Sequence, residues 1–255
     1  MPLVLVTVPC LSDNYAYLLH DETSGQTALI DVPEAAPILR ELDARGWSLS
    51  EVWITHHHDD HVQGLGTVLA NQNARVRGAK ADRHRLPTLD DEHSDGDSFS
   101  FAGHTVSVMD VSGHTVGHIA YYVPDASAVF TADSLMAMGC GRLFEGTAEQ
   151  MWASLSKIAD LPPDTDVCSG HEYTAANAKF ALTIDPDNED LILRTKAISS
   201  ARTAGQPTVP SKLALELATN PFLRAGNTEI RTRLNMQEAS DADVFAEIRA
   251  RKDAF

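Results

Sequence analysis

Residues 55–61 read Thr-His-His-His-Asp-Asp-His and directly follow the apolar segment 52–54, Val-Trp-Ile. Such a segment predicts a buried strand, so the histidine-rich run should lie in the loop at its end, where binding sites are commonly built. Three imidazoles and a carboxylate held together without a cation would leave polar groups repelling one another or unsatisfied. The run therefore predicts a metal site on a fold that brings strand ends together.

The spacing of the run, HxHxDH, predicts two ions. In an extended segment alternate side chains share a face, so His56 and His58 can approach one ion while Asp60 and His61, past a bend, reach a second. A zinc site takes four or five ligands, and a catalytic site keeps one position for water, so other parts of the chain must supply ligands. The candidates, each after a predicted strand, are His114, Asp133 and His171.

The other histidines have simpler explanations. His57 and Asp59 alternate away from the ligand face and should make hydrogen bonds that stabilise the loop. His118 runs into the predicted strand 119–123, so it could be a ligand or a structural residue beside the site; we favour the second role. Surface or hydrogen-bonded positions are expected for His20, His84, His93 and His104.

The apolar pattern changes character near residue 172. Before it, short β-prone runs alternate with helices, one over 34–45 ending at Gly46 and one beginning at Thr147 with a capping box to Gln150. The acidic stretch 90–97 reads as a loop. After residue 172 the apolar residues take a helical period, and Arg249 and Lys252 lie three apart on the last predicted helix. The pattern predicts an α/β part followed by a small helical part.

Composition narrows the function. A formal net charge of −16 makes a poor surface for nucleic acid, and no apolar stretch is long enough to span a bilayer. Cys10, Cys140 and Cys168 are widely spaced without a Cys-x-x-Cys pair, which favours a reducing compartment and argues against a disulfide framework. Cys140, between two glycines, is expected to be a packed thiol and not a nucleophile. We expect a cytoplasmic, monomeric enzyme with neither a nucleic-acid nor a membrane partner.

HxHxDH with downstream His, Asp and His resembles the metallo-β-lactamase superfamily. More narrowly, the chain resembles the glyoxalase II family over almost its whole length, in Asp13-Asn14-Tyr15, in the segments 130–135 and 139–146, in Gly170-His171-Glu172-Tyr173, in 220–224 and in 249–253. The resemblance implies an α/β fold: an αββα metallo-β-lactamase sandwich over residues 1–172, and an all-helical substrate-binding domain over 173–255 that covers the active-site mouth.

The resemblance also implies the role of each site residue. His56, His58 and His114 would bind one ion, Asp60, His61 and His171 the other, and Asp133 would bridge them. The ions would be divalent, zinc first, with iron or manganese as alternatives. The glutathione moiety would be held by Arg142, Phe144, Tyr173, Arg249 and Lys252. Phe144 departs from family members that carry tyrosine there, so it can pack against substrate but cannot donate a hydrogen bond.

The implied reaction is hydrolysis of S-D-lactoylglutathione to D-lactate and glutathione, the second step of methylglyoxal detoxification. A hydroxide bridging both metals, held with Asp133, would attack the acyl carbon, because a metal can lower the pKa of bound water from about 15.7 to near 7. Thiolate is a good leaving group, so no serine or cysteine nucleophile is required. The alternatives on the same scaffold are a mononuclear iron glutathione persulfide dioxygenase and another thioesterase or lactonase.

Overall fold

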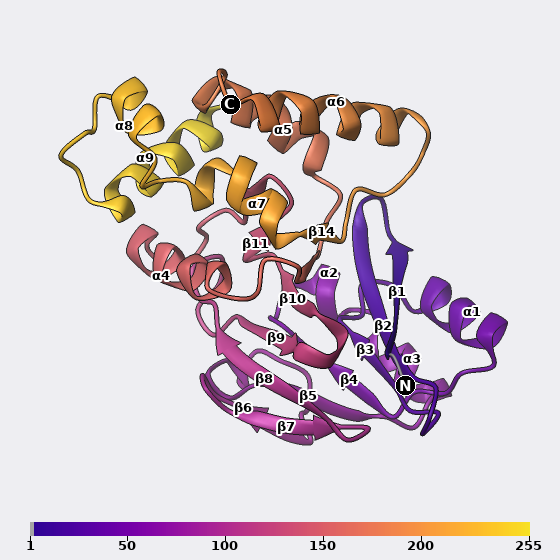
Figure 1. Cartoon of the computed structure of the whole chain (residues 1–255). Coiled ribbons are helices and arrows are strands. Elements are labelled where there is room, and N and C mark those ends of the chain that lie inside the picture. Colours follow the sequence, from indigo (N-terminus) through magenta and orange to yellow (C-terminus); the bar gives the residue numbers. More distant parts are fainter. Residues whose placement is uncertain (1–2) are drawn as a thin grey trace. The chain divides into compact units, whose positions relative to one another are not determined.

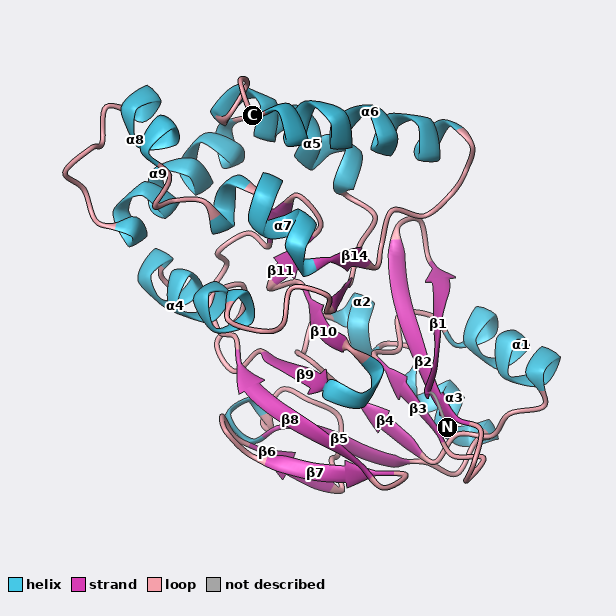
Figure 2. Ribbon diagram, in the orientation of Figure 1, coloured by secondary structure: helices cyan, strands magenta, loops and turns pink. Residues whose placement is uncertain are grey.

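The computed structural model describes residues 3–255, which divide by compactness into two units. Unit 1 runs to Asp110 and includes Val116–Ala132, whereas unit 2 comprises Val111–Thr115 and Asp133–Phe255. Strands prevail in unit 1 and helices in unit 2 (Figure 2). His114 therefore belongs to a short segment of unit 2 that is flanked in sequence by unit 1, and Asp133 is the first residue after unit 1 ends.

The first sheet of unit 1 has six strands in sequence order from edge to edge (Figure 1). Its strands are β1 (Leu3–Cys10), β2 (Asn14–Asp21), β3 (Thr27–Ile30), β4 (Glu51–Trp53), β5 (Arg75–Ala79) and β6 (Asp91–His93). Strands β1 to β3 pair antiparallel and β3 to β6 pair parallel. Because the carboxyl ends of parallel strands meet at one edge, Asp31 after β3 and Thr55 after β4 emerge side by side.

A second set of strands in unit 1 is antiparallel, in the order β10-β9-β8-β7. These strands are β7 (Ser98–Phe101), β8 (His104–Asp110), β9 (Ile119–Val123) and β10 (Ala128–Ala132). The two sheets pack through Trp53, whose fully buried ring lies 5.3–5.4 Å from the rings of Phe99, Phe101 and Tyr121. An aromatic cluster of this size fixes the strand that delivers the histidine run.

Three helices and two short 3₁₀ turns complete unit 1. They are α1 (Ala35–Arg45), α2 (Asp59–Val62), α3 (Leu65–Asn71), η1 (Lys80–Asp82) and η2 (Pro124–Ala126). Helix α1 buries Ile38 and Leu42 and ends at Gly46, whose φ of 68° is the left-handed conformation that glycine adopts at little cost. The helix predicted over 34–45 is thus confirmed.

Unit 2 is mainly helical, with two short antiparallel strand pairs. Its elements are β11 (Leu135–Met136), β12 (Gly139–Cys140), α4 (Ala148–Ala159), β13 (Asp166–Ser169), α5 (Thr174–Ile184), α6 (Glu189–Thr203), β14 (Ser211–Lys212), α7 (Leu213–Thr219), η3 (Pro221–Leu223), α8 (Thr228–Leu234) and α9 (Asp241–Ala254). Helix α4 begins with the predicted capping box between Thr147 and Gln150. In the core of unit 2, Phe222 stacks on Phe180, with centroids 6.0 Å apart, and meets Phe245 edge-on at 5.8 Å.

The prediction of a loop over 90–97 is wrong at Asp91–His93, which forms β6, and is correct for the turn 94–97. The charge of Asp91, one of the acidic residues that favoured a loop, is neutralised by two arginines of the neighbouring strand β5. Arg77 Nη1 donates to Asp91 at 2.8 Å, and Arg75 forms a second ion pair with the same carboxylate. Charge pairing across an edge strand thus permits a sequence of low β-propensity to pair.

Candidate metal centre

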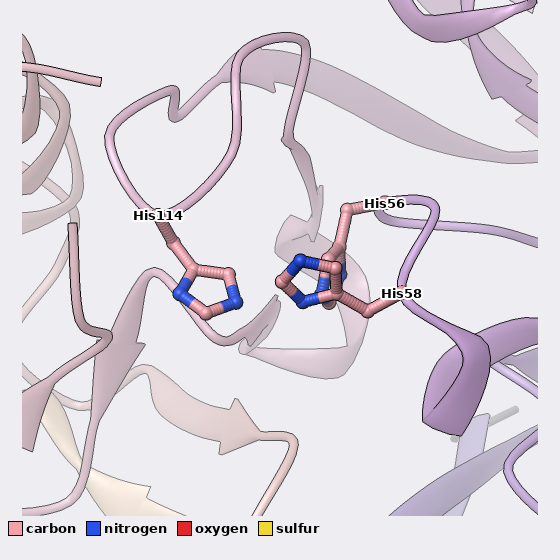
Figure 3. Close-up of side chains that lie close together, drawn as sticks. All are labelled: His56, His58 and His114. Carbon is pink, nitrogen blue, oxygen red and sulfur yellow. The ribbon is translucent and has the colours of Figure 1, made fainter. Parts of the chain in front are cut away.

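The histidine-rich run forms a cluster in unit 1 at the carboxyl edge of the parallel strands. Its first part is extended and its last part enters α2, so the chain bends between His58 and Asp60. His56 and His58 project from this segment (Figure 3), with ring centroids 4.8 Å apart. The rings of His56 and His61 are 4.2 Å apart, and both side chains are fully buried. The bend brings the four predicted ligands of this run to one place.

Asp31 organises this cluster, although the sequence analysis did not single it out. Its carboxylate accepts hydrogen bonds from the Thr55 backbone N–H at 2.9 Å and the Thr55 hydroxyl at 2.8 Å, and lies 2.8 Å from Nδ1 of His61. A carboxylate on Nδ1 fixes the tautomer that leaves Nε2 to act as a metal ligand. The available signal was an aspartate directly after the buried strand β3.

Two further contacts hold the run in place. Asn14 donates to the Asp60 carboxylate at 3.0 Å and to the Asp60 carbonyl at 3.1 Å, which accounts for the Asp13-Asn14-Tyr15 motif. Nδ1 of His57 lies 2.8 Å from the buried Asp82 carboxylate, so the predicted loop-stabilising role of His57 is confirmed. Asp59 is exposed in the first turn of α2.

A second cluster lies within unit 2. One oxygen of the buried Asp133 carboxylate is 3.4 Å from Nε2 of His114 and 3.3 Å from Nε2 of His171. Nδ1 of His114, which projects from its own loop (Figure 3), lies 2.8 Å from the carbonyl oxygen of Arg142. Because a carbonyl can only accept, Nδ1 carries the proton, and Nε2 is the nitrogen available to a cation.

Gly141 permits this close packing. A Cβ at this position would lie 2.0 Å from the carbonyl oxygen of Asp133 and 2.9 Å from Nδ1 of His114. Any side chain here would displace the backbone that presents Asp133. The second glycine of the Gly-Cys-Gly-Arg motif, Gly141, is therefore needed to bring Asp133 and His114 together, and not only to shape its own loop.

Two exposed aromatic rings flank the histidines of unit 2. Phe144 is 60% exposed, and its ring meets that of His114 edge-on at 5.3 Å. Tyr173 is 41% exposed and stacks on His171, with centroids 4.7 Å apart and planes 7° apart. Exposed aromatic surface beside a polar cluster is suited to packing against a bound small molecule.

The predicted cations differ in how much of each side chain is accessible. Arg249 is buried, donates to the Cys140 carbonyl at 3.1 Å and pairs with Asp253 at 2.8 Å. Arg142 is exposed and approaches the same Asp253 carboxylate at 3.3 Å. The Lys252 ammonium lies 5.2 Å from the rings of Phe180 and Phe255. The pKa of Lys252 is lowered, mainly by burial and to a smaller extent by the positive charge of Arg249. Arg249, Arg142 and Lys252 form the basic cluster of unit 2. Within this cluster the buried Arg249 holds neighbouring groups of the protein, the Cys140 carbonyl and Asp253, in place.

The cysteines are buried thiols. Burial raises the pKa of Cys140 to about 11, although the Arg249 guanidinium opposes the shift, and burial also raises the pKa of Cys10 to about 11. Burial raises the pKa of Cys168 as well. A nucleophilic cysteine needs a lowered pKa, so the environment of Cys140 is the opposite of an activated one.

Comparison with known proteins gives two matching family models. The metallo-beta-lactamase superfamily model matches residues 12–171, and the hydroxyacylglutathione hydrolase C-terminus model matches residues 172–255. The predicted fold class, α/β with a helical C-terminal part, is confirmed. Because the two compact units divide the chain at other positions, the predicted domain boundary after residue 172 stays a prediction.

Similar proteins match over the full length. The chain is 72% identical to a hydroxyacylglutathione hydrolase of Roseobacter denitrificans and 65% identical to one of Ruegeria pomeroyi, with 100% of each chain covered. The crystal structure of the BLEG-1 B3 metallo-β-lactamase superposes with a TM-score of 0.67 at 20% identity, covering 86% of this chain and 99% of that one. ETHE1 from Myxococcus xanthus superposes with a TM-score of 0.64 at 23% identity, covering 100% and 99%. These two structures share the fold.

Within residues 3–255, no helix is both long and apolar enough to cross a membrane.

Proposed function

Because the chain belongs to the hydroxyacylglutathione hydrolase family of the metallo-β-lactamase superfamily, and is thus a metal-dependent hydrolase, we propose that it hydrolyses S-D-lactoylglutathione to D-lactate and glutathione. The observation that carries the proposal is the pair of His/Asp clusters, one in each unit, together with a basic and aromatic cluster in unit 2. The two His/Asp clusters suit metal-assisted activation of water, and the basic and aromatic cluster suits the binding of an anionic thiol conjugate.

We assign the ligands of two divalent ions to these clusters. His56, His58 and His114, whose side chains are drawn in Figure 3, would hold one ion. Asp60, His61 and His171 would hold the other, and Asp133 would serve both. Support comes from within each unit, since the Asp133 carboxylate already lies beside two imidazoles and Asp31 orients His61.

The donor set fits such a centre. His56, His61 and His114 each have Nδ1 beside an oxygen atom, so each can offer Nε2 to an ion. Imidazole and carboxylate donors without thiolate suit zinc, and also iron or manganese; we propose zinc. A seven-ligand set shared by two ions leaves room for water, unlike a closed structural site of four ligands.

The residues define what the protein contributes to hydrolysis. When bound, the ions supply an activated water and a Lewis acid for the thioester carbonyl. Asp133 and His114 would position these groups, and Gly141 leaves the space for them, because a Cβ there would lie 2.0 Å from the Asp133 carbonyl oxygen. The glutathione thiolate leaves without an acid, and the raised pKa of Cys140 argues against a competing acyl-enzyme route.

Glutathione recognition is assigned to unit 2. With a formal net charge of −16, the surface repels an anionic conjugate, so binding requires local cations, and Arg142 and Lys252 are the accessible ones. Phe144 and Tyr173 offer exposed rings beside the histidines for packing. Arg249 acts chiefly by holding the Cys140 backbone and Asp253, next to which Arg142 lies.

A mononuclear persulfide dioxygenase is less well supported, because it would leave Asp60, His61 and His171 without an ion. The full-length relatives at 65–72% identity carry the hydrolase name, and the similarity to ETHE1, at 23% identity, concerns the fold. Counting ions per chain at full activity separates thioester hydrolysis from the dioxygenase reaction.

We also propose that the protein is a cytoplasmic monomer with neither nucleic acid nor a membrane as a partner.

The test is steady-state hydrolysis of S-D-lactoylglutathione by the metallated enzyme and by Lys252→Met. We expect efficient turnover, and in the variant a KM raised about tenfold with kcat nearly unchanged, because the cation contributes uniform binding. Lys196→Met removes the same charge from exposed α6 and should leave KM within about twofold. A fully metallated enzyme that ignores this thioester overturns the proposal.

A further inference from the structure

His118 is fully buried in unit 1, directly before β9, and its sequence context favoured a structural residue beside the site over a metal ligand. We infer that His118 is a positioning residue, which holds the imidazole plane of His56 against rotation and so prepares His56 to bind its ion. The inference rests on the proposed assignment of His56 as a metal ligand.

The geometry that carries the inference is a parallel stack. The ring centroids of His118 and His56 are 4.5 Å apart and the planes differ by 13°. The rings of His58 and His61 meet that of His56 at 71° and 48°. His118 thus lies against the flat face of His56, whereas the other two predicted ligands meet it at an angle.

The stack also distinguishes positioning from ligation. Imidazoles that bind one ion direct a nitrogen from each ring edge at a common point. Two rings stacked at 13° keep their nitrogen lone pairs in two nearly parallel planes that do not meet at one point, so His118 is poorly placed to share an ion with His56. Its contribution is contact with the ring face.

His118 is itself held in register with His56 by the backbone. Its Nδ1 lies 3.2 Å from the carbonyl oxygen of Ile119, which can only accept, so the ring donates there. The N–H of Ile119 donates to the Thr55 carbonyl at 3.0 Å, and Thr55 Oγ1 lies 3.0 Å from Nδ1 of His56. A backbone hydrogen bond from Ile119 to Thr55 therefore joins the start of β9 to the segment carrying His56, and each ring of the stacked pair contacts one of these two residues.

This arrangement restrains His56 at two points. Thr55 contacts the ring at Nδ1, and His118 blocks rotation of the ring plane. A ligand held within about 10–20° of its productive orientation loses little freedom when the ion binds, which raises metal affinity. Removing a group that orients a metal-binding histidine typically lowers affinity about 10- to 100-fold.

The experiment measures the binding of Zn²⁺ and Co²⁺ to the metal-free protein by competition with a chromophoric chelator, with the d–d absorption of Co²⁺ as a second readout. We expect His118→Ala to weaken one of the two ions about 10-fold and to change the Co²⁺ spectrum, while the other ion is affected less than about threefold. His118→Phe keeps a flat ring and should stay within about threefold of the parent at both sites. His118→Gln keeps a donor for the Ile119 carbonyl without a ring, and should behave like His118→Ala.

His93→Ala is a matched control, because His93 is also a buried histidine of unit 1 that stacks on a ring, that of Phe99 at 4.8 Å. It should lower the melting temperature without changing metal affinity. Should His118→Ala unfold, the comparison of His118→Phe with His118→Gln carries the same prediction.

Unchanged affinity in the alanine and glutamine variants would overturn the inference. The inference would also be overturned if His118→Phe lost as much affinity for one ion as His118→Ala does, because that result would identify His118 as a metal ligand. Failure of the parent protein to hydrolyse the thioester, with the affinity pattern intact, would count against the proposed reaction and leave the positioning role standing.

Discussion

A carboxylate oxygen of Asp31 lies 2.8 Å from Nδ1 of His61, and both side chains are buried. The same carboxylate accepts two hydrogen bonds from Thr55, the residue before His56. One aspartate, thirty positions from His61 in sequence, thereby orients a predicted ligand and anchors the loop that carries the others.

Replacing this aspartate should weaken metal binding more than it weakens the fold. Asp31→Asn is expected to lower zinc affinity about 10- to 100-fold, because the amide accepts fewer hydrogen bonds and no longer favours the tautomer of His61 that offers Nε2. The measurement is chelator competition. Asp21→Asn changes another buried aspartate of unit 1 and should leave zinc affinity intact; equal losses in both variants would contradict the role given to Asp31.

Gly141→Ala should disrupt the unit 2 cluster. The new Cβ would lie 2.0 Å from the Asp133 carbonyl oxygen, so the backbone presenting Asp133 must move. A displacement of about 1 Å at a catalytic group commonly costs about 100-fold in rate, and we expect a loss of kcat of that order. Gly66→Ala in α3, where a Cβ meets nothing within 4 Å, is the control and should be active. Wild-type kcat in Gly141→Ala would refute the packing argument.

Glu216 should be a large contributor to the stability of unit 2. Its fully buried carboxylate accepts from the Met138 N–H at 2.8 Å, Ser211 Oγ at 2.6 Å and Asn220 Nδ2 at 3.1 Å, and forms an ion pair with Arg194. Glu216→Leu leaves the guanidinium and these donors without the carboxylate, which typically costs about 3–5 kcal/mol of unfolding free energy.

Denaturation by urea measures this loss. Adding Arg194→Leu to Glu216→Leu removes the unpaired charge and should recover part of it. A loss below about 1 kcal/mol in the single variant would show that solvent reaches the site.

The buried thiols should make the protein less stable at alkaline pH. The pKa of Cys10 and Cys140 is raised from 9.0 to about 11, so between these values the unfolded thiols lose protons that the folded ones keep. Unfolding then releases protons, and stability falls as pH rises above about 9. Cys10→Ala/Cys140→Ala should show a shallower decline of the melting temperature between pH 8.5 and about 10.5. A decline of equal steepness would assign the effect to other groups.

Local patterns predicted much of the fold because they reflect local physics. The strand 52–54, the helix ending at Gly46 and the capping box at Thr147 each depend on neighbours a few residues apart, and each is confirmed in β4, α1 and α4. The edge strand β6 was not predicted, since the charge of its Asp91 is balanced by arginines of a different strand, Arg75 and Arg77.

The contacts around the site could not be predicted from the sequence, because they too join residues that are far apart in the chain. Asp31 and Asn14 contact the histidine run across 30 and 46 positions, and Glu216 contacts Met138 across 78. A single aspartate or glutamate has no periodicity or spacing to reveal such a contact. The ligand set itself was predicted from a dense motif and a family resemblance, and its assignment to two ions is still a proposal.

The most direct test of the account is to titrate the metal-free enzyme with Zn²⁺ while following the hydrolysis of S-D-lactoylglutathione. If the clusters of unit 1 and unit 2 together form one binuclear centre, activity should rise to a plateau at two ions per chain. Full activity with one ion per chain, or no activity with two ions per chain, would contradict a binuclear hydrolytic centre.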